Sequence, residues 1–179
     1  MSSLTTGGIP STAVSLLGAS QINPGKPLPP LTVKETSAER PETVVLTGRN
    51  IIIGVPGAFT GTCSGQISGY IEEYEAFKAK GVEGIYVVAV NDQFVMNGWK
   101  EKLAPNGTPI HFLADDQGTF TSETGLIFDA TPLLGGPRSK RYVMIVNDNH
   151  VVSLAVEDDP NKVTVTSAKM ILTALSFMF

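Results

Sequence analysis

The sequence predicts a single α/β domain in which helices flank a central mixed β-sheet, and three observations support this fold class. The chain has 179 residues, of which 42% are hydrophobic, so it is long enough to bury one core. Apolar, β-branched runs alternate with helix-periodic segments, which is typical of βαβ units. Near the C-terminus, two further strand-like runs precede a helix-like segment, which predicts an antiparallel hairpin and a closing helix.

The compact domain is predicted to span residues 25–179, after a flexible N-terminal arm over residues 1–24. Prolines force an extended, non-helical chain just before Leu31, because the proline ring fixes its own backbone and restricts the residue before it. These prolines are Pro24, Pro27, Pro29 and Pro30.

The first strands are predicted over residues 44–46 and 51–55, as a hairpin or a strand pair around the turn-like Gly48-Arg49-Asn50. Apolar residues then recur at steps of three and four between Ile67 and Phe77, which predicts a helix.

Gly81 follows this helix as its expected capping residue. The apolar run 85–90 predicts a central strand, which completes a βαβ unit. The remaining predicted elements are a helix over 94–103, a strand over 110–114, a short helix near 118–124, a hairpin of 142–146 with 151–156, and a helix from the capping residue Ser167 to Leu175. Together these elements are typical of a thioredoxin-like α/β fold.

Composition excludes several classes of partner. The net charge is −4 and no basic run is present, so we expect no nucleic-acid partner. No apolar stretch reaches the ~18 residues of a membrane span, so we expect no membrane partner. One cysteine allows no internal disulfide framework and favours a reducing compartment, for which we expect the cytoplasm. The first 34 residues lack acidic side chains, which leaves a mitochondrial location as the alternative.

Cys63 is the candidate nucleophile. It follows a predicted strand and a loop rich in Gly and Pro, and it lies where a helix begins. Unpaired amides and the helix dipole at that position favour a thiolate, which is the reactive form of cysteine. The alternative is that Cys63 is a small buried hydrophobic residue, and position alone does not decide between the two.

The segment around Cys63 resembles the peroxiredoxin family. Residues 56–63 read PGAFTGTC and contain the family pattern P-x-x-x-T-x-x-C. The resemblance covers about Gly25 to Leu175 and is strongest to the peroxiredoxin-five subfamily. Further matches are Gly69-Tyr70, Lys78-Ala79-Lys80-Gly81-Val82, Val90-Asn91-Asp92-Gln93-Phe94-Val95, Trp99, and Ser139-Lys140-Arg141-Tyr142.

The resemblance implies roles for individual residues. The Thr60 hydroxyl would hydrogen-bond the peroxide, and Pro56 would shape the loop and shield the sulfur from water. Arg141 would stabilise the thiolate and the developing charge. The other loop residues of the site would be Gly57, Phe59 and Thr62.

The sequence also departs from the family pattern. Gly61 stands where proline is common, so we expect a more flexible loop. The segment from Ser64 to Gly69 is one residue shorter than usual and lacks the family His and Pro, so we expect a rearranged first helical turn. A glycine in this turn costs up to about 1 kcal/mol relative to alanine.

The expected function is therefore that of a thiol-dependent peroxidase that reduces hydrogen peroxide and alkyl hydroperoxides without a cofactor. Because no second cysteine is present, an external thiol would reduce the sulfenic acid, supplied by glutathione with glutaredoxin or by thioredoxin. The resemblance also implies a homodimer. The alternatives are a peroxide sensor or holdase-like protein with low turnover, and a non-catalytic scaffold.

Other polar and aromatic residues are expected to have structural roles. His111 and His150 show no paired ligand spacing, so no metal site is expected. The acidic pair at 115–116 and the acidic triplet at 157–159 are interpreted as solvated turns. Phe94 and Trp99 are expected to pack in the core.

Overall fold

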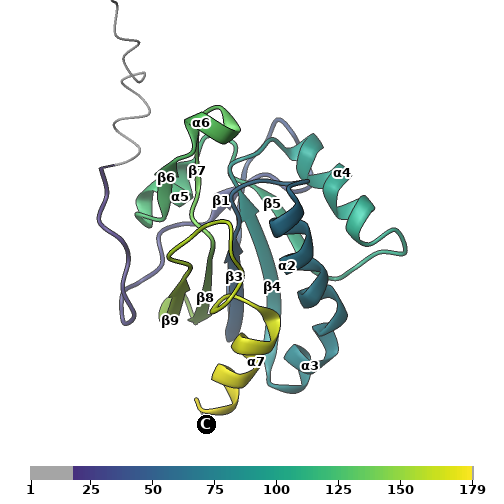
Figure 1. Cartoon of the computed structure of the whole chain (residues 1–179). Coiled ribbons are helices and arrows are strands. Elements are labelled where there is room, and N and C mark those ends of the chain that lie inside the picture. The colour runs from purple at the N-terminus through teal and green to yellow at the C-terminus, as the bar shows by residue number, and fades with distance from the viewer. Residues whose placement is uncertain (1–17, 179) are drawn as a thin grey trace, which may run out of the picture.

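A five-stranded mixed sheet forms the centre of the computed structural model, which describes residues 18–178 (Figure 1). Its strand order is β5-β4-β3-β8-β9, formed by His111–Ala114, Val82–Ala89, Arg49–Gly54, Tyr142–Asn147 and His150–Val156. The strands β3, β4 and β5 run parallel, whereas β8 is antiparallel to both β3 and β9. The predicted central sheet, βαβ unit and C-terminal hairpin are thus confirmed.

Helices cover the sheet on both faces because successive residues of a buried strand point to opposite sides. Ile51 and Ile53 of β3 lie in one core cluster with residues of α2, α3, α4 and α7. Ile52 between them lies in a second cluster, which is covered by α5 and by the N-terminal segment. These helices are α2 (Gly61–Glu72), α3 (Tyr74–Ala79), α4 (Gln93–Leu103), α5 (Thr119–Glu123) and α7 (Ala168–Ser176).

The predicted helix through Ile67 to Phe77 consists of two helices that break at Glu73, whose backbone is non-helical. Gly81 ends the second one with φ of +77°, as expected for a capping glycine. Ser167 caps α7 as predicted, because its side chain accepts a hydrogen bond from the amide of Met170.

Small elements that the sequence did not indicate complete the chain. The strands β1 (Thr32–Val33) and β2 (Glu42–Thr43) form one short ribbon, and β6 (Ile127–Asp129) and β7 (Pro137–Ser139) form another. The short helix α6 (Thr131–Leu134) connects β6 to β7.

The predicted pairing of residues 44–46 with residues 51–55 is wrong. Both edges of β3 are already occupied, one by β4 and the other by β8, so no edge is left for a further strand. Residues 44–46 instead lie on a face of the sheet, where Leu46 is buried and Val45 is 75% exposed.

The N-terminal segment is in contact with the domain from its first described residues. The amide of Ile22 donates to the carbonyl of Thr124, and the amide of Gly25 donates to that of Val151. Residues 1–17 of the predicted arm lie outside the described residues, and the boundary at residue 25 stays a prediction.

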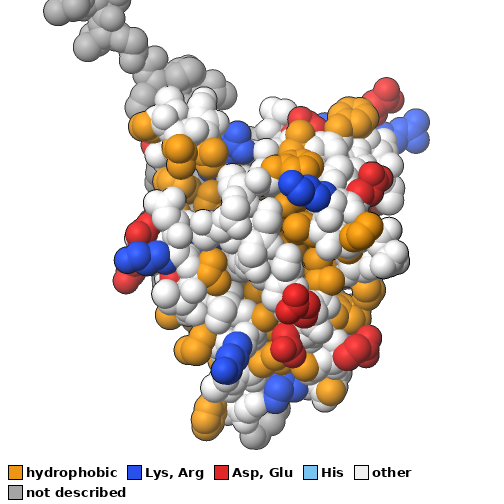
Figure 2. Space-filling view, turned by 45° about the vertical axis from the view of Figure 1, so that its right-hand side comes forward, with side chains coloured by type: hydrophobic (Ala, Val, Ile, Leu, Met, Phe, Trp, Pro, Cys, Tyr) orange, Lys and Arg blue, Asp and Glu red, His pale blue; other side chains and the backbone are white. Residues whose placement is uncertain are grey.

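Charged side chains are dispersed on the surface. On the face that Figure 2 shows, Lys and Arg side chains lie apart from one another among acidic, polar and hydrophobic ones. None of the helices within residues 18–178 has the length and apolar character that a membrane span demands.

Gly54 provides a test of the packing beneath the site. A Cβ atom at this position would lie 2.0 Å from the ring of Tyr142, which is fully buried. We expect Gly54→Ala to lower the free energy of unfolding by about 1–3 kcal/mol or more, because the core must shift to admit a methyl group. Urea denaturation measures this loss.

Gly136→Ala is the matched control, because a Cβ atom there meets no atom within 4 Å. Its unfolding free energy should stay close to that of the parent. Equal stability of the two variants would contradict the close packing of Gly54 against Tyr142.

Candidate active site

The loop between β3 and α2 places Cys63 at the start of a helix. Thr60 is the N-cap residue with an extended backbone, and α2 begins at Gly61. The first intrahelical hydrogen bond runs from the amide of Ser64 to the carbonyl of Thr60. The amides of Gly61, Thr62 and Cys63 therefore have no acceptor within the helix, and the side chain of the N-cap residue accepts no hydrogen bond from them. The predicted location of Cys63 in the first helical turn is confirmed.

The first turn of α2 is regular in spite of the shortened sequence after Cys63. The helix continues without interruption to Glu72, so the rearrangement expected there is absent. Trp99 of α4 anchors this turn from the side, because its indole Nε1 donates to Ser64 Oγ over 3.0 Å. Trp99 is fully buried, as predicted.

The loop itself is fixed by hydrogen bonds to its backbone. The amide of Ala58 donates to Asn91 Oδ1 over 3.0 Å, and the hydroxyl of Thr60 donates to the carbonyl of Gly57 over 2.9 Å. Phe59 between them has φ of +65°, which is unusual for a residue other than glycine. Its ring is 47% exposed and lies 5.6 Å from Lys102 Nζ.

Arg141 reaches Cys63 from the start of the strand next to β3. It directly precedes β8, whose first residue Tyr142 pairs with Gly54 at the end of β3. The antiparallel register thus brings Arg141 to the end of the sheet at which the Cys63 loop begins. Arg141 Nη2 donates to Cys63 Sγ over 3.3 Å, and both side chains are buried, with exposures of 2% and 0%. The guanidinium charge therefore faces the sulfur in a site without bulk water, where a charge-assisted hydrogen bond is strong.

A pocket of about 270 Å³ opens beside this pair. One wall of the pocket is formed by Pro56, Thr60 and Thr62 of the Cys63 segment together with Arg141. Its other wall comes from the segment around α6 and from the loop before α7. The first contributes the apolar residues Phe128, Ala130, Pro132, Leu133 and Leu134 together with Asp129, and the second contributes Pro160 and Asn161. The structure thus brings together Pro56, Thr60, Cys63 and Arg141. Gly57 is buried within the loop, whereas Phe59 turns outward.

Two acidic residues interpreted as solvated are buried. Asp115 is 3% exposed and accepts hydrogen bonds from the amides of Phe120 and Thr121 at the start of α5. Burial raises the pKa of Asp115, although these hydrogen bonds oppose the shift. Glu157 is 8% exposed and accepts hydrogen bonds from Thr164 and Thr166. Both predictions are wrong because amide and hydroxyl donors five to nine residues further along the chain take the place of water.

Phe94 and Gln66 also differ from the sequence interpretation. Phe94 is 75% exposed, because it is the second residue of α4 and lies on the outer side of that helix, so its predicted core packing is wrong. Gln66 was not singled out, yet its Oε1 accepts a hydrogen bond of 2.7 Å from Arg141 Nη1. A polar residue one turn after Cys63 was the only local signal for it.

Within residues 18–178, no group of three or more His, Cys, Asp or Glu side chains is arranged to hold a metal ion. The arrangement supports chemistry at sulfur: a buried cysteine, a guanidinium in contact with it, unpaired helix amides and a pocket that reaches the guanidinium. The fold and this site define a thiol-dependent oxidoreductase of the thioredoxin-like class.

Comparisons with known proteins specify the class further. The family model described as Redoxin matches residues 23–172. The chain is 43% identical over 152 residues to "Peroxisomal membrane associated protein 20" of Schizosaccharomyces pombe, which covers 84% of this chain and 97% of that protein. It is 43% identical over 126 residues to "Peroxiredoxin-2C" of Oryza sativa subsp. japonica, which covers 70% of this chain and 76% of that protein.

Solved structures agree with this assignment. Reduced Prx3 from Vibrio vulnificus superposes with a TM-score of 0.79 at 38% identity, covering 87% of this chain and 99% of that chain. Peroxiredoxin 5 from Alvinella pompejana superposes with a TM-score of 0.78 at 31% identity, with the same coverage. The chain belongs to the peroxiredoxin family and is a thiol-dependent peroxidase, and its resemblance to the peroxiredoxin-five subfamily is confirmed.

Gly65 tests whether the helix that carries Cys63 is weakened by glycine. A Cβ atom at Gly65 meets no atom within 4 Å, and the residue is helical. We expect Gly65→Ala to raise the free energy of unfolding by roughly 0.5–1 kcal/mol, because alanine loses less backbone entropy in a helix.

Gly135→Ala is the opposite control, because that position is equally open but has φ of +80°. It should lower the unfolding free energy, since alanine avoids this backbone region. A destabilised Gly65→Ala variant in urea denaturation would refute the expectation.

Proposed function

We propose that Cys63 is the nucleophile that reduces hydrogen peroxide and alkyl hydroperoxides. The observation that carries the proposal is the contact of 3.3 Å between Arg141 Nη2 and Cys63 Sγ in a buried site. The thiolate attacks the terminal peroxide oxygen, an S–O bond forms and the O–O bond breaks. The sulfur gains the OH group as a sulfenic acid, and the departing oxygen takes up a proton to leave as water or as an alcohol.

The residues around Cys63 suit the charges that this step moves. The guanidinium of Arg141 holds the sulfur as an anion and stays in contact as negative charge passes to the leaving oxygen. The unpaired amides at the start of α2 donate to the peroxide. Because the Thr60 hydroxyl donates its hydrogen bond to the Gly57 carbonyl, its oxygen can accept a hydrogen bond from the O–H of the peroxide. Pro56, which is buried, excludes water from the sulfur.

The pocket and a relative support the two substrate classes. A structure of the Vibrio vulnificus Prx3, at 38% identity, contains hydrogen peroxide, which supports this peroxide as a substrate of the present chain. The apolar wall from Phe128 to Leu134 supports alkyl hydroperoxides, because it offers surface for burying an alkyl group.

An external thiol completes the proposed cycle. The chain has one cysteine, so the sulfenic acid meets no second thiol of the same chain. One thiol condenses with it to form a mixed disulfide and water, and a second thiol displaces Cys63 as a thiolate. Glutathione with glutaredoxin and thioredoxin are both suitable donors of these two electrons.

A peroxide sensor or holdase-like protein with low turnover is the alternative function. It is favoured by the full burial of Cys63, since a sulfur with 0% exposure restricts access by a reducing thiol. Slow turnover together with stable mixed disulfides to a client protein would support the sensor over the enzyme.

The assembly and the location are also proposals. We propose a homodimer, as the family resemblance implies, and analytical ultracentrifugation tests it. We keep the cytoplasm as the proposed location, with the mitochondrion as the alternative. The names of two relatives, one peroxisomal and one mitochondrial, add the peroxisome to the compartments to examine by cell fractionation and support examining the mitochondrion.

The first functional prediction concerns the sulfur. Peroxide without thiol should add one oxygen to Cys63, and excess peroxide should then give sulfinic and sulfonic acids, because no thiol of the chain competes for the sulfenic acid. Cys63→Ser should lose peroxide consumption and keep its fold. Intact-mass measurement and a peroxide assay with added thiol check these results. Consumption by the serine variant at the parent rate would refute the role of Cys63.

The second functional prediction concerns Arg141. Arg141→Ala should slow the reaction of Cys63 with hydrogen peroxide by roughly 10- to 100-fold, the loss expected for one charge-assisted hydrogen bond. The pH dependence of the rate should also change, because the charge next to the sulfur is removed. Arg141→Lys should recover part of the rate, since lysine keeps the charge but lacks the planar fork.

Stopped-flow measurements of sulfur oxidation at several pH values test this role. An alanine variant with the rate and pH profile of the parent would show that the guanidinium does not assist the sulfur.

A further inference from the structure

Two acceptors besides the Cys63 sulfur hold the guanidinium of Arg141. Its Nε and Nη2 atoms both donate to the carbonyl of Pro160, over 3.0 and 2.8 Å. Its Nη1 atom donates to Gln66 Oε1 over 2.7 Å. Because these contacts leave Nη2 directed at Cys63 Sγ, they fix the orientation of the fork relative to the sulfur.

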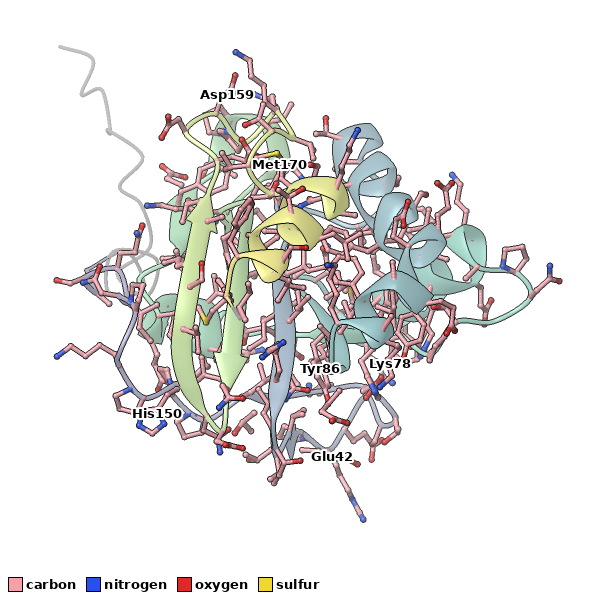
Figure 3. All side chains as sticks on the ribbon, turned by 90° about the horizontal axis from the view of Figure 1, so that it is seen from below. Glu42, Lys78, Tyr86, His150, Asp159 and Met170 are labelled. Atoms are coloured by element: carbon pink, nitrogen blue, oxygen red, sulfur yellow. The ribbon has the colours of Figure 1, made fainter. Side chains whose placement is uncertain are left out.

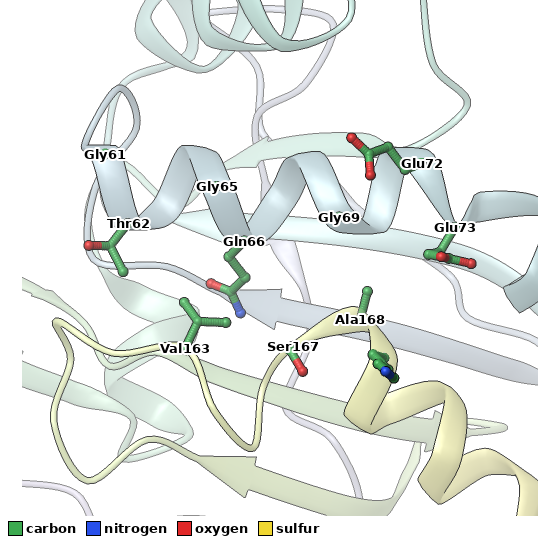
Figure 4. Close-up of a pocket in the computed structure, with 11 residues that line it drawn as sticks. Gly61, Thr62, Gly65, Gln66, Gly69, Glu72, Glu73, Val163, Ser167 and Ala168 are labelled. Carbon is green, nitrogen blue, oxygen red and sulfur yellow. The ribbon is translucent and has the colours of Figure 1, made fainter.

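Gln66 is in turn held by the segment that leads into α7. Its side chain extends from α2 toward this segment, which Val163 and Ser167 mark in Figure 4. Gln66 Nε2 donates to the carbonyl of Thr166 over 3.2 Å, and the hydroxyl of Tyr70 donates to the same carbonyl over 2.7 Å. Burial, with a contribution from Glu157, raises the pKa of Tyr70 well above its usual value, so this hydroxyl stays a donor.

Both contacts to Arg141 thus depend on one loop, residues 157–166, and this loop folds around the carboxylate of Glu157. Glu157 Oε1 accepts hydrogen bonds from the Thr164 amide, the Thr166 amide and the Thr166 hydroxyl, over 2.6, 2.9 and 2.8 Å. Glu157 Oε2 accepts one from the Thr164 hydroxyl over 2.6 Å.

The arrangement suits an ionised Glu157, because an ionised carboxylate can only accept hydrogen bonds, and the groups around it are all donors. Burial alone would raise the pKa of Glu157, but the hydrogen bonds from Thr164 and Thr166 outweigh it and lower the pKa. The backbone closes the loop at its start, where the Glu157 amide donates to the carbonyl of Arg141 over 3.0 Å.

We propose that Glu157 is a positioning residue of the peroxidase: it folds the 157–166 loop so that the carbonyls of Pro160 and Thr166, the latter through Gln66, aim Arg141 at Cys63. The inference rests on the proposed role of Cys63 and Arg141 in peroxide reduction. Glu157 itself contacts neither the sulfur nor the peroxide pocket, so it acts only through the groups that hold the guanidinium.

Two substitutions at Glu157 separate loop geometry from charge. In Glu157→Ala the donors of Thr164 and Thr166 lose their acceptor, and the loop loosens around Arg141. In Glu157→Gln the amide oxygen can accept the three bonds that Oε1 accepts, and the amide nitrogen can donate to the Thr164 hydroxyl, which then serves as acceptor. The glutamine variant therefore keeps the geometry and removes the charge.

Asp159→Asn is the matched control for loss of one negative charge in the same loop. Asp159 lies at the outer end of the loop (Figure 3), and its Oδ1 accepts hydrogen bonds from the amide and side chain of Asn161. An asparagine at this position keeps an acceptor oxygen for the Asn161 amide.

The experiment measures the second-order rate of Cys63 oxidation by hydrogen peroxide across pH, together with the free energy of unfolding. We expect Glu157→Ala to react roughly 10- to 100-fold more slowly near neutral pH, because a loosened Arg141 loses its charge-assisted hydrogen bond to the sulfur. Its pH profile should change in the same way as that of Arg141→Ala. Glu157→Gln should retain most of the rate, and Asp159→Asn should match the parent.

A double-mutant cycle with Arg141→Ala distinguishes positioning from a general structural effect. If Glu157 acts through Arg141, then Glu157→Ala should cause little further loss of rate in the Arg141→Ala background. Additive losses, or a Glu157→Ala variant that reacts as fast as the parent, would overturn the proposal. If the parent itself does not react with peroxide, the proposed function fails instead, so the two failures are distinguishable.

Discussion

The rest of the site depends on the contact between the buried guanidinium of Arg141 and the buried sulfur of Cys63. A guanidinium is always charged and carries five N–H donors, so its burial at Arg141 costs several kcal/mol unless those donors are paired. Cys63, the Pro160 carbonyl and Gln66 provide the acceptors. These acceptors offset the cost of burying the charge, and one of them is the sulfur of Cys63.

Sheet topology brings the two groups together. Cys63 and Arg141 are separated by 78 residues, and each lies close to one of two adjacent strands. Because β3 and β8 are antiparallel, the end of one meets the beginning of the other, and Gly54 pairs with Tyr142. Gly54 leaves room for the Tyr142 ring, so the same register serves both the core and the site. The helix amides, the loop and the guanidinium consequently converge on one point.

The C-terminal part of the chain then supplies the acceptors that the strands lack. The loop from Glu157 to Thr166 presents one carbonyl to Arg141 directly and another to Gln66. A carboxylate with four donors organises this loop without occupying the pocket. The pocket beside Arg141 is lined by Pro56, Thr60 and Thr62, by the largely apolar segment around α6, and by Pro160 and Asn161 of this loop.

The sequence by itself determined the local elements and the position of Cys63, the proposed nucleophile, at the start of a helix. Periodicity, the cap at Ser167, the glycine at 81 and the motif ending at Cys63 depend on neighbours within a few turns, so they could be predicted correctly. Only the tertiary structure decided which groups distant in sequence meet. It placed residues 44–46 on a sheet face and paired Gln66 with Arg141. It also buried Asp115 and Glu157 against the rest of the domain, although their donors lie only five to nine residues further along the chain. These outcomes depend on long-range packing and on hydrogen-bond partners up to 100 residues away, such as the carbonyl of Thr166 for Gln66, which no local pattern encodes.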